Sequence, residues 1–457
     1  MKVSFFGGAQ EVTGACYLLE TEAAPPAGGR RTKILVDCGL FQCPGICEAI
    51  NHEPFPFDVK EAEAVFVTHS HIDHIGRIPK LFKEGFSGKV FSTPATKELA
   101  RIMLEDNLQL LKKGQNNGGS EILFDENNLE KAAASWEELD YHEEKTVGGL
   151  KIRLLDAGHV LGSSMIEIKA EGKKIIFSGD LGNPPTPLLR PYEKITDADF
   201  MIVESTYGDR LHEDKKERQL KIERVIENTV KNKGVLMIPA FSLERTQELL
   251  FEFNELVEKG RVPEVPVFLD SPLAIRATEV YRKYERYYNK EAQYIISSGD
   301  KVFKFPMLKF TLTTEESKAI NDVPAPKIVI AGSGMSTGGR ILHHEKRYLS
   351  DPNSAILMVG YQAAGSLGRR IADGAKSVRI FGEEVPVRCR VETIRGYSAH
   401  PDQDMLLDFV RNSADTLEKV FCVQGEPAAA LFLVQRVRDY LGIDAIAPRY
   451  GESFELK

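Results

Sequence analysis

The 457-residue chain lacks the features that mark several large classes of protein. Its six cysteines include no Cys-x-x-Cys pair, which argues against a disulfide framework and a cysteine-ligated zinc site and fits a reducing cytoplasm. No apolar stretch approaches the roughly 20 residues that a membrane-spanning helix needs. The first eight residues carry one basic residue and almost no apolar segment, so we do not expect a signal peptide.

An excess of positive charge is missing as well. The chain has 59 Lys and Arg against 67 Asp and Glu, a formal net charge of −8. Nucleic-acid-binding proteins usually carry a basic face, so this balance does not indicate one, although a local basic groove is compatible with an acidic protein. The composition, 42% hydrophobic and 28% charged, is that of a soluble globular protein, and the length favours two domains.

Residues 68–74 concentrate side chains that can carry chemistry. They read Thr-His-Ser-His-Ile-Asp-His and directly follow a short apolar run that is typical of a buried strand. His69 and His71 alternate, so both imidazoles can turn to one side, while Asp73 and His74 offer ligand atoms to a second point nearby. Imidazole nitrogen and carboxylate oxygen suit zinc, so this loop predicts part of a zinc site.

The same arrangement, a buried strand followed by an acidic residue or a histidine, recurs along the first half of the chain. Its members are Asp37 after residues 34–36, His159 after 151–155, Asp180 after 174–177 and Glu204 after 200–203. His159 and Asp180 complete what a binuclear site requires. Asp37 could orient a metal-bound histidine or simply close a turn.

Beyond Glu204 the pattern changes to alternating strands and helices. Residues 213–233 predict a charged helix, strands follow at 235–239, 266–270, 327–331 and 356–360, and helices are expected from Ser242, near Pro272 and near Gly338. This alternation predicts a largely parallel sheet covered on both faces. We expect it to form a second domain, after which Ser398-Ala399-His400 and a final strand at 421–426 return to the chemistry of the first.

A known family carries the same residues in the same order. Through Asp37, His69-x-His71-x-Asp73-His74, His159, Asp180, Glu204 and His400, the chain resembles the metallo-β-lactamase superfamily and, within it, the β-CASP nucleases. The resemblance covers nearly the whole chain. It implies an α/β fold: a four-layer αβ/βα metallo-β-lactamase domain from residues 1–208 and 385–457, with a doubly wound α/β β-CASP domain, residues 209–384, inserted between its halves. It also implies an active site in the cleft between the domains.

The resemblance further implies a role for each residue. His69, His71 and His159 would hold one zinc ion, Asp73, His74 and His400 would hold a second, and Asp180 would bridge the two. Asp37 and Glu204 would lie behind these ligands, with Glu204 orienting a histidine such as His400. Two Zn²⁺ ions per chain, roughly 4 Å apart, would share a hydroxide that attacks phosphorus. Asp73, Asp180, Glu204 and His400 would form the catalytic set.

Two positions depart from the family pattern. Arg370 stands where the pre-mRNA endonuclease has a candidate general-acid histidine, and arginine cannot release a proton near neutral pH, although its fork can bind phosphate. The acid would then be a zinc-bound water or another histidine, such as His343 or His344. Gln424 stands where we expect a histidine behind the metal ligands. Both departures lower the expected rate rather than metal binding.

Three other segments are candidates for binding substrate phosphate. Ser163 could donate a hydrogen bond or close a turn. The Gly/Ser-rich loop 332–340, with Ser336 and Gly338, could cradle phosphate through backbone N–H groups or form a plain tight turn, and it lacks the lysine of an ATPase P-loop. Arg245, at the start of a predicted helix, could face the cleft or the solvent.

The leading hypothesis is a zinc-dependent ribonuclease of RNA processing or decay, endonucleolytic, with 5′→3′ exonucleolytic attack as a second mode. Single-stranded RNA is the expected substrate, the cytoplasm the expected location, and a homodimer one open oligomeric state; no membrane partner is expected. A small-molecule metallo-hydrolase acting on a thioester or lactam is disfavoured because the inserted domain would roof over an open cleft. A non-catalytic RNA-processing scaffold is disfavoured because all seven metal ligands are present. A DNA-directed relative is disfavoured by the histidine at position 400.

Overall fold

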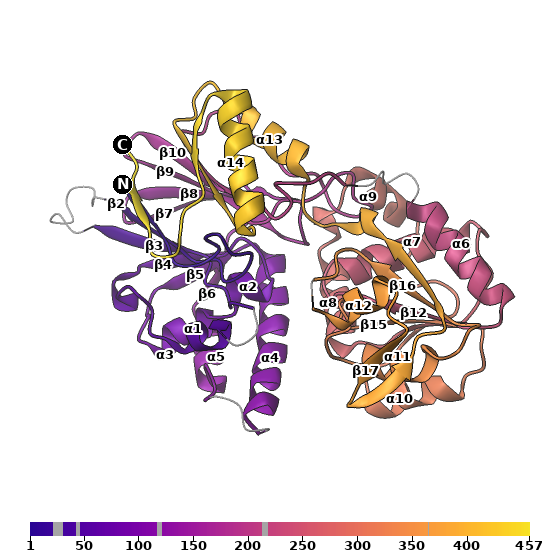
Figure 1. The fold of residues 1–457 in the computed structure, drawn as a ribbon. Coiled ribbons are helices and arrows are strands. Elements are labelled where there is room, and N and C mark those ends of the chain that lie inside the picture. Colours follow the sequence, from indigo (N-terminus) through magenta and orange to yellow (C-terminus); the bar gives the residue numbers. More distant parts are fainter. Residues whose placement is uncertain (22–30, 43–45, 117–120, 213–217, 364) are drawn as a thin grey trace. The chain divides into compact units, whose positions relative to one another are not determined.

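The computed structural model describes residues 1–21, 31–42, 46–116, 121–212, 218–363 and 365–457. Within these ranges the chain forms two compact units, one from Met1–Leu211 and Ala399–Lys457 and the other from His212–Ser398 (Figure 1). The first unit is therefore built from two separate chain segments, and the second is one continuous insertion. None of the described helices is long and apolar enough to cross a membrane.

Two β-sheets, each of seven strands in the described ranges, form the middle of the first unit. One sheet has the order β22 (Ser453–Glu455), β1 (Lys2–Phe5), β2 (Tyr17–Thr21), β3 (Thr32–Val36), β4 (Ala64–Phe66), β5 (Lys89–Ser92) and β6 (Trp136–Glu138). The other has the order β21 (Asp444–Ile446), β20 (Lys419–Val423), β11 (Phe200–Glu204), β10 (Lys173–Phe177), β9 (Ser164–Ala170), β8 (Leu150–Asp156) and β7 (Glu144–Val147).

The central strands are buried on both faces, which explains why they read as continuous apolar runs. Successive side chains of a strand point to opposite faces. In β3, Ile34 and Val36 enter the core between the two sheets, while Leu35 enters the core on the outer face. Aromatic contacts close the inner core, as where the rings of Phe5 and Phe421, from different sheets, have centroids 5.3 Å apart.

Helices cover the outer face of each sheet (Figure 1). Those beside the first sheet are α1 (Ile46–His52), α2 (Ile72–Ile75), α3 (Ile78–Lys83), α4 (Pro94–Asn116) and α5 (Glu126–Ala134). Those beside the second are α13 (Gln403–Arg411) and α14 (Pro427–Leu441). Their apolar side chains join the two outer cores, so the unit has the four layers that the sequence predicted.

The second unit contains a parallel sheet, also as predicted. Its order is β14 (Leu308–Phe310), β13 (Val267–Leu269), β15 (Lys327–Ala331), β12 (Val235–Pro239), β16 (Ala355–Val359) and β19 (Arg390–Ile394). The described helices are α6 (Arg218–Lys231), α7 (Arg245–Glu258), α8 (Pro272–Lys283), α9 (Lys290–Ser297), α10 (Thr314–Ala319), α11 (Ile341–Tyr348) and α12 (Leu367–Ala372), and β17 (Ser377–Ile380) pairs with β18 (Glu383–Pro386).

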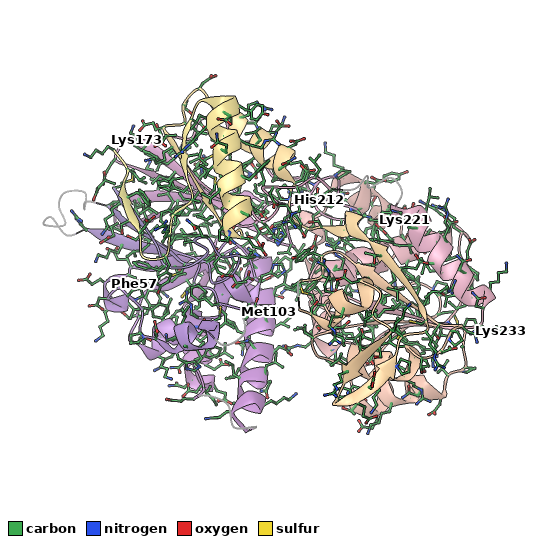
Figure 2. All side chains as sticks on the ribbon, in the orientation of Figure 1. Phe57, Met103, Lys173, His212, Lys221 and Lys233 are labelled. Atoms are coloured by element: carbon green, nitrogen blue, oxygen red, sulfur yellow. The ribbon has the colours of Figure 1, made fainter. Side chains whose placement is uncertain are left out.

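The ends of this unit bear on the predicted domain limits. Figure 2 labels Lys221 on α6 and Lys233 just beyond it, and residues 213–217 of the predicted charged helix lie outside the described residues. At the other end β19 pairs with β16, so the sheet of the second unit extends to Ile394. The chain belongs to the first unit again from Ala399. The limits at 208/209 and 384/385 stay predictions.

The sheets of the first unit bring the candidate site residues to their strand ends. β3 and β4 run parallel in one sheet, and β10, β11 and β20 run parallel in the other. Side chains that follow the carboxyl ends of parallel strands gather at the same edge. Asp37, Asp180 and Gln424 follow such ends, and Glu204 is the last residue of β11.

Candidate metal centre

The histidine-rich stretch, residues 68–74, follows β4 and ends in the short helix α2, which begins at Ile72. Its backbone is fixed from outside, because the Asp73 carbonyl accepts from the Ala15 N–H at 2.9 Å and the His74 carbonyl accepts from the Cys38 N–H at 2.8 Å. Gly39 makes this close approach feasible: a Cβ at that position would lie 1.5 Å from the Asp73 carbonyl oxygen. The loop is thus held rigidly before any side-chain contact is considered.

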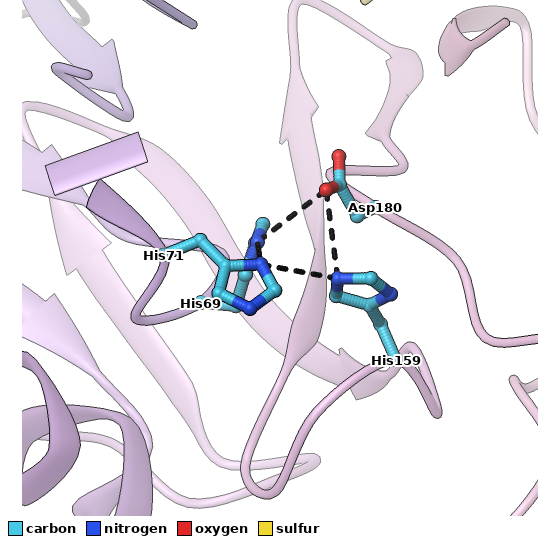
Figure 3. A group of neighbouring side chains, drawn as sticks. All are labelled: His69, His71, His159 and Asp180. Carbon is cyan, nitrogen blue, oxygen red and sulfur yellow. Dashed lines mark hydrogen bonds and ion pairs between the residues drawn. The ribbon is translucent and has the colours of Figure 1, made fainter. Parts of the chain in front are cut away.

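Four side chains converge to form the first group of ligand atoms (Figure 3). His71 Nδ1 lies 3.1 Å from His69 Nε2 and 3.3 Å from His159 Nε2, and Asp180 Oδ2 lies 3.5 Å from His69 Nε2 and 3.6 Å from His159 Nε2. Zinc bound tetrahedrally at 2.0–2.1 Å would separate its ligand atoms by about 3.3–3.4 Å. The observed spacings bracket this value, so the donor set fits a metal ion.

The histidines of this group are held in the form that binds metal. Burial lowers the pKa of His69 and of His159 well below the usual range, and it lowers the pKa of His71 to about 4. Neutral imidazoles carry the free electron pair that ligation requires. Burial alone would raise the pKa of Asp180, but the neighbouring His74 and His69 hold it well below its usual range, so this carboxylate is ionised.

A second pair, Asp37 and His74, lies behind the ligands. Asp37 is fully buried; its Oδ2 lies 2.7 Å from His74 Nδ1, and its Oδ1 accepts from the Thr68 N–H at 2.8 Å. Burial alone would lower the pKa of His74, but the carboxylates of Asp180 and Asp37 outweigh it and raise that pKa well above its usual range. This edge of the site therefore favours positive charge.

Asp180, Glu204 and His400 form the other group of mutually close ligand atoms in the described residues. Glu204 is fully buried; its Oε2 lies 2.9 Å from His400 Nδ1, and its Oε1 accepts from the Leu181 N–H at 2.6 Å. His400 Nδ1 lies 4.0 Å from Asp180 Oδ2, and its side chain is 21% exposed. Glu204 thus fixes the orientation of the His400 ring through Nδ1.

The ligand atoms predicted to bind the second zinc ion lie less close to one another than those of the first group. Asp180 joins it to the first group, since its Oδ1 lies 3.3 Å from His74 Nε2. Asp73, His74 and His400 do not form one cluster of mutually close ligand atoms among the described residues. Burial raises the pKa of Asp73. The assignment of Asp73, His74 and His400 to a second metal stays a prediction.

Ser163 closes the turn that carries His159. Its buried Oγ accepts from the His159 N–H at 2.9 Å and from the Val160 N–H at 3.2 Å. The hydroxyl therefore shapes the metal centre from behind. A contact of Ser163 with substrate phosphate stays a prediction.

The other phosphate-binding candidates lie in the second unit and differ in exposure. Arg245 is only 5% exposed, donates to Glu248, and lies with its guanidinium carbon 5.0 Å from the centre of the Tyr397 ring. Arg370 is exposed on α12, and the backbone at Gly338 has open space around it. The side chain of Arg370 is thus exposed, whereas the guanidinium of Arg245 is buried.

Ser336 is also buried, and its hydroxyl donates to Glu345 Oε1. The other carboxyl oxygen, Oε2, has no hydrogen-bond partner among the described residues. Burial raises the pKa of Glu345 to about 8, although the Ser336 hydroxyl opposes the shift. The Ser336 side chain thus anchors the Gly/Ser-rich loop to α11 beside an acid that is neutral at pH 7.

Glu345 makes the stability of the second unit depend on pH. The folded chain keeps a proton on Glu345 up to about pH 8, whereas unfolded glutamate releases it near the reference value of 4.5, so raising the pH between these values destabilises the fold. Between pH 5 and 8.5, the free energy of unfolding of wild type is expected to fall on the order of 3 kcal/mol more than that of Glu345→Gln, because glutamine has no proton to release. Thermal unfolding at four pH values measures this difference. Glu392→Gln, on exposed β19, is the control; parallel curves for wild type and Glu345→Gln would refute the prediction.

Gln424 is a residue of the centre that the sequence interpretation undervalued. The sequence predicts only the loss of a histidine at this position, yet the buried side chain contacts both His74 and Asp180. The position itself is a signal, because Gln424 directly follows β20 as Asp37 directly follows β3.

Family models match the chain in three segments. The model described as the metallo-beta-lactamase superfamily matches residues 10–226, the Beta-Casp domain matches 246–371, and the Zn-dependent metallo-hydrolase RNA specificity domain matches 384–448. The chain belongs to the β-CASP branch of the metallo-β-lactamase superfamily.

Full-length relatives agree with this assignment. Ribonuclease TTHA0252 of Thermus thermophilus is 41% identical over 457 residues, 99% of each chain. Transcription termination factor FttA of Methanocaldococcus jannaschii is 32% identical over 100% of this chain and 72% of its own, and an RNase J-like protein of the same organism is 32% identical over 98% of each. The crystal structure of a protein of unknown function from Enterococcus faecalis V583 covers 100% of this chain and 99% of its own at 14% identity and a TM-score of 0.57, a likeness of fold alone. With its family models and its cluster of ligands, this chain is a metal-dependent RNA hydrolase.

Proposed function

We propose that the chain is a zinc-dependent ribonuclease that cuts single-stranded RNA internally, with 5′→3′ exonucleolytic attack as a second mode. The observation that carries this proposal is the convergence of His69, His71, His159 and Asp180 at spacings that suit zinc. The match to an RNA specificity domain and the ribonuclease named among the relatives support RNA as the substrate.

Metal ions at such a site activate water and neutralise charge on phosphoryl oxygens. His69, His71, His159 and Asp180 would hold the first ion, and Asp73, His74 and Asp180 would contribute to a second position. Asp37 keeps the tautomer of His74 fixed, because a carboxylate at 2.7 Å requires the proton on Nδ1 and leaves Nε2 facing the site. The backbone contacts of Asp73 and His74 hold the loop in place during the reaction.

We assign the proton for the leaving 3′-oxygen to His400. Glu204 Oε2 lies 2.9 Å from His400 Nδ1 and orients the ring, whose side chain is 21% exposed, and we propose that Nε2 passes its proton to the substrate oxygen. Arg370 cannot take this role, and His344 is buried against Asp270 in the second unit at 2.7 Å. The ligand role that the sequence implied for His400 also uses Nε2. The zinc content of a His400 variant separates the two roles, because only the loss of a ligand lowers it.

Substrate phosphates are the proposed ligands of two groups in the second unit. The exposed fork of Arg370 can bind one phosphate in a bidentate manner. The loop at Gly338 has room for a phosphate, because a Cβ built there would meet no atom within 4 Å, and the Ser336–Glu345 contact holds the loop in shape. These contacts act through shape and charge, so they predict binding with little dependence on base sequence.

His400→Ala is expected to lower the rate of RNA cleavage by about 10²- to 10⁴-fold while zinc at the first position is retained, because proton transfer is lost and the ligands are not. Cleavage of 5′-labelled single-stranded RNA and the zinc content of the same sample measure both. Internal fragments would establish endonucleolytic cutting, and single nucleotides from the 5′ end the exonucleolytic mode.

His142→Ala is the matched control, since His142 is 59% exposed and belongs to neither group of mutually close ligand atoms in the described residues. Loss of zinc in His400→Ala would assign His400 to the metal instead. If zinc-loaded wild type and His69→Ala both leave RNA intact, the ribonuclease proposal fails. Chromogenic ester and lactam substrates would then test a small-molecule hydrolase.

A further inference from the structure

The backbone of Gln424 is fixed on three sides. Its N–H donates to the Gly8 carbonyl at 2.6 Å, and its own carbonyl accepts from Thr206 Oγ1 at 3.0 Å. The preceding carbonyl, of Val423, accepts from Ser205 Oγ at 2.7 Å. Gln424 has a φ of 50°, in the left-handed region that non-glycine residues rarely adopt, and it is only 2% exposed. The fold therefore directs this side chain into the metal centre.

The amide of Gln424 reaches two predicted metal ligands at once. Its Nε2 lies 2.7 Å from His74 Nε2 and 2.7 Å from Asp180 Oδ1, and those two atoms lie 3.3 Å apart. Both atoms belong to the predicted second position, and it is the other oxygen of Asp180, Oδ2, that lies near His69 and His159. Gln424 thus contacts two ligand atoms of the predicted second position.

Two arrangements satisfy every atom at this point. When His74 is neutral, its Nδ1–H donates to Asp37 and its Nε2 has a free electron pair, so both N–H bonds of the Gln424 amide can donate, one to His74 and one to Asp180. With a cation present, His74 and Asp180 turn their electron pairs to it, and the amide must rotate by half a turn to present its oxygen. An amide nitrogen cannot be a ligand, but an amide oxygen can.

We propose that Gln424 governs the second metal position. Its amide nitrogen closes that position when it is empty, and its amide oxygen serves as a weak ligand when it is filled. A divalent cation must therefore displace two hydrogen bonds in order to enter, and it gains a neutral oxygen where an imidazole would have offered nitrogen. The second position binds zinc more weakly than the first, and it favours cations that accept oxygen ligands, such as Mn²⁺.

Metal counting without RNA tests this inference. The full chain is loaded with Zn²⁺, dialysed against a mild chelator, and its remaining zinc is titrated with a chromophoric indicator. Wild type is expected to keep about one zinc per chain, and Gln424→His about two, because the second affinity rises by at least ~10-fold. Gln435→His, which adds a histidine on the exposed face of α14, controls for adventitious zinc and should match wild type.

Manganese provides the second measurement. After the first zinc is bound, added Mn²⁺ should enter the wild-type second position, seen as a fall in the EPR signal of free Mn²⁺. In Gln424→Ala, where the amide ligand is removed, Mn²⁺ affinity should fall by about tenfold or more while the first zinc stays. Two equally retained zinc ions in wild type would overturn the proposal, and so would unchanged Mn²⁺ affinity in Gln424→Ala.

The inference rests on the metal-centre part of the proposed function and not on the substrate. A chain that keeps one tight zinc and cuts no RNA would support Gln424 as the governing residue while it contradicts the ribonuclease proposal. A chain that keeps two tight zinc ions and cuts RNA would contradict the role of Gln424 and support the ribonuclease proposal.

Discussion

Asp180→Asn is expected to lower RNA cleavage on the order of 10³- to 10⁴-fold and to strip metal from both positions. One carboxyl oxygen, Oδ2, lies 3.5 Å from His69 Nε2 and 3.6 Å from His159 Nε2, and the other, Oδ1, lies 3.3 Å from His74 Nε2. Asparagine keeps one oxygen, but its amino group cannot be a ligand. The substitution also removes the one carboxylate of the first group and leaves three neutral imidazoles there.

Zinc content by mass spectrometry and cleavage of labelled RNA, measured on the same preparation, check this expectation. Asp199→Asn is the matched control. Asp199 lies directly before the first residue of β11, whereas Glu204 is its last residue, and the Asp199 carboxylate accepts from the Lys174 N–H at 2.7 Å. It should keep both metal and activity. Full metal content together with normal cleavage in Asp180→Asn would show that the ligand assignment is wrong.

Asp270→Ala is expected to destabilise the second unit by about 3–5 kcal/mol. Asp270 follows β13, is fully buried, and accepts hydrogen bonds from Thr311 Oγ1 at 2.8 Å, Ser317 Oγ at 2.7 Å, Arg340 Nη1 at 2.8 Å and His344 Nε2 at 2.7 Å. Removing the carboxylate leaves the buried imidazole of His344 without its partner. Arg340, 21% exposed, keeps the carbonyls of Thr311 and Leu312 as acceptors, so the lost partner of His344 accounts for most of the expected loss.

Urea unfolding, with hydrogen exchange of the β13 and β15 amides to assign the change to this unit, measures the loss. Asp322→Ala, at an exposed position, should stay within about 0.5 kcal/mol of wild type. Unfolding of Asp270→Ala at the wild-type urea concentration would refute the prediction.

The Asp270 carboxylate also makes the stability of the second unit depend on pH in the acid range. Burial alone would raise the pKa of Asp270, but hydrogen bonds led by that from His344 outweigh it and lower the pKa to about 2. Its contribution to stability is present above the reference value of 3.8 and is lost as the pH falls toward 2.

Most of the candidate metal ligands could be predicted from sequence because each stands in a short local pattern of residues. An apolar run followed by Asp, His or Glu marks the end of a buried strand, and parallel strands bring such ends to one edge. The structure places Asp37, His69, Asp180 and Glu204 at these ends. The alternation of strands and helices after Glu204 likewise predicted the parallel sheet, since helices must separate parallel strands.

What the sequence could not reveal is the direction of individual polar side chains. Ser336 in a Gly/Ser-rich loop and Arg245 at a helix start both suggested phosphate binding, yet their side chains are buried against Glu345 and Glu248. Nothing in the spacing of serine and glutamate distinguishes a buried hydrogen bond from two exposed residues. The contact of Gln424 is hidden in the sequence for a related reason: its amide lies against His74, which is 350 positions away in the chain.

The split first unit has a consequence for synthesis on the ribosome. β1 pairs with β22, and β11 pairs with β20, so neither sheet can be completed until the last residues emerge. The second unit is continuous and can fold while the remainder is still being made. His69, His71, His159 and Asp180 all emerge long before Gln424. A nascent chain therefore offers these histidines to metal ions before the residue that we propose to govern the second position has been made.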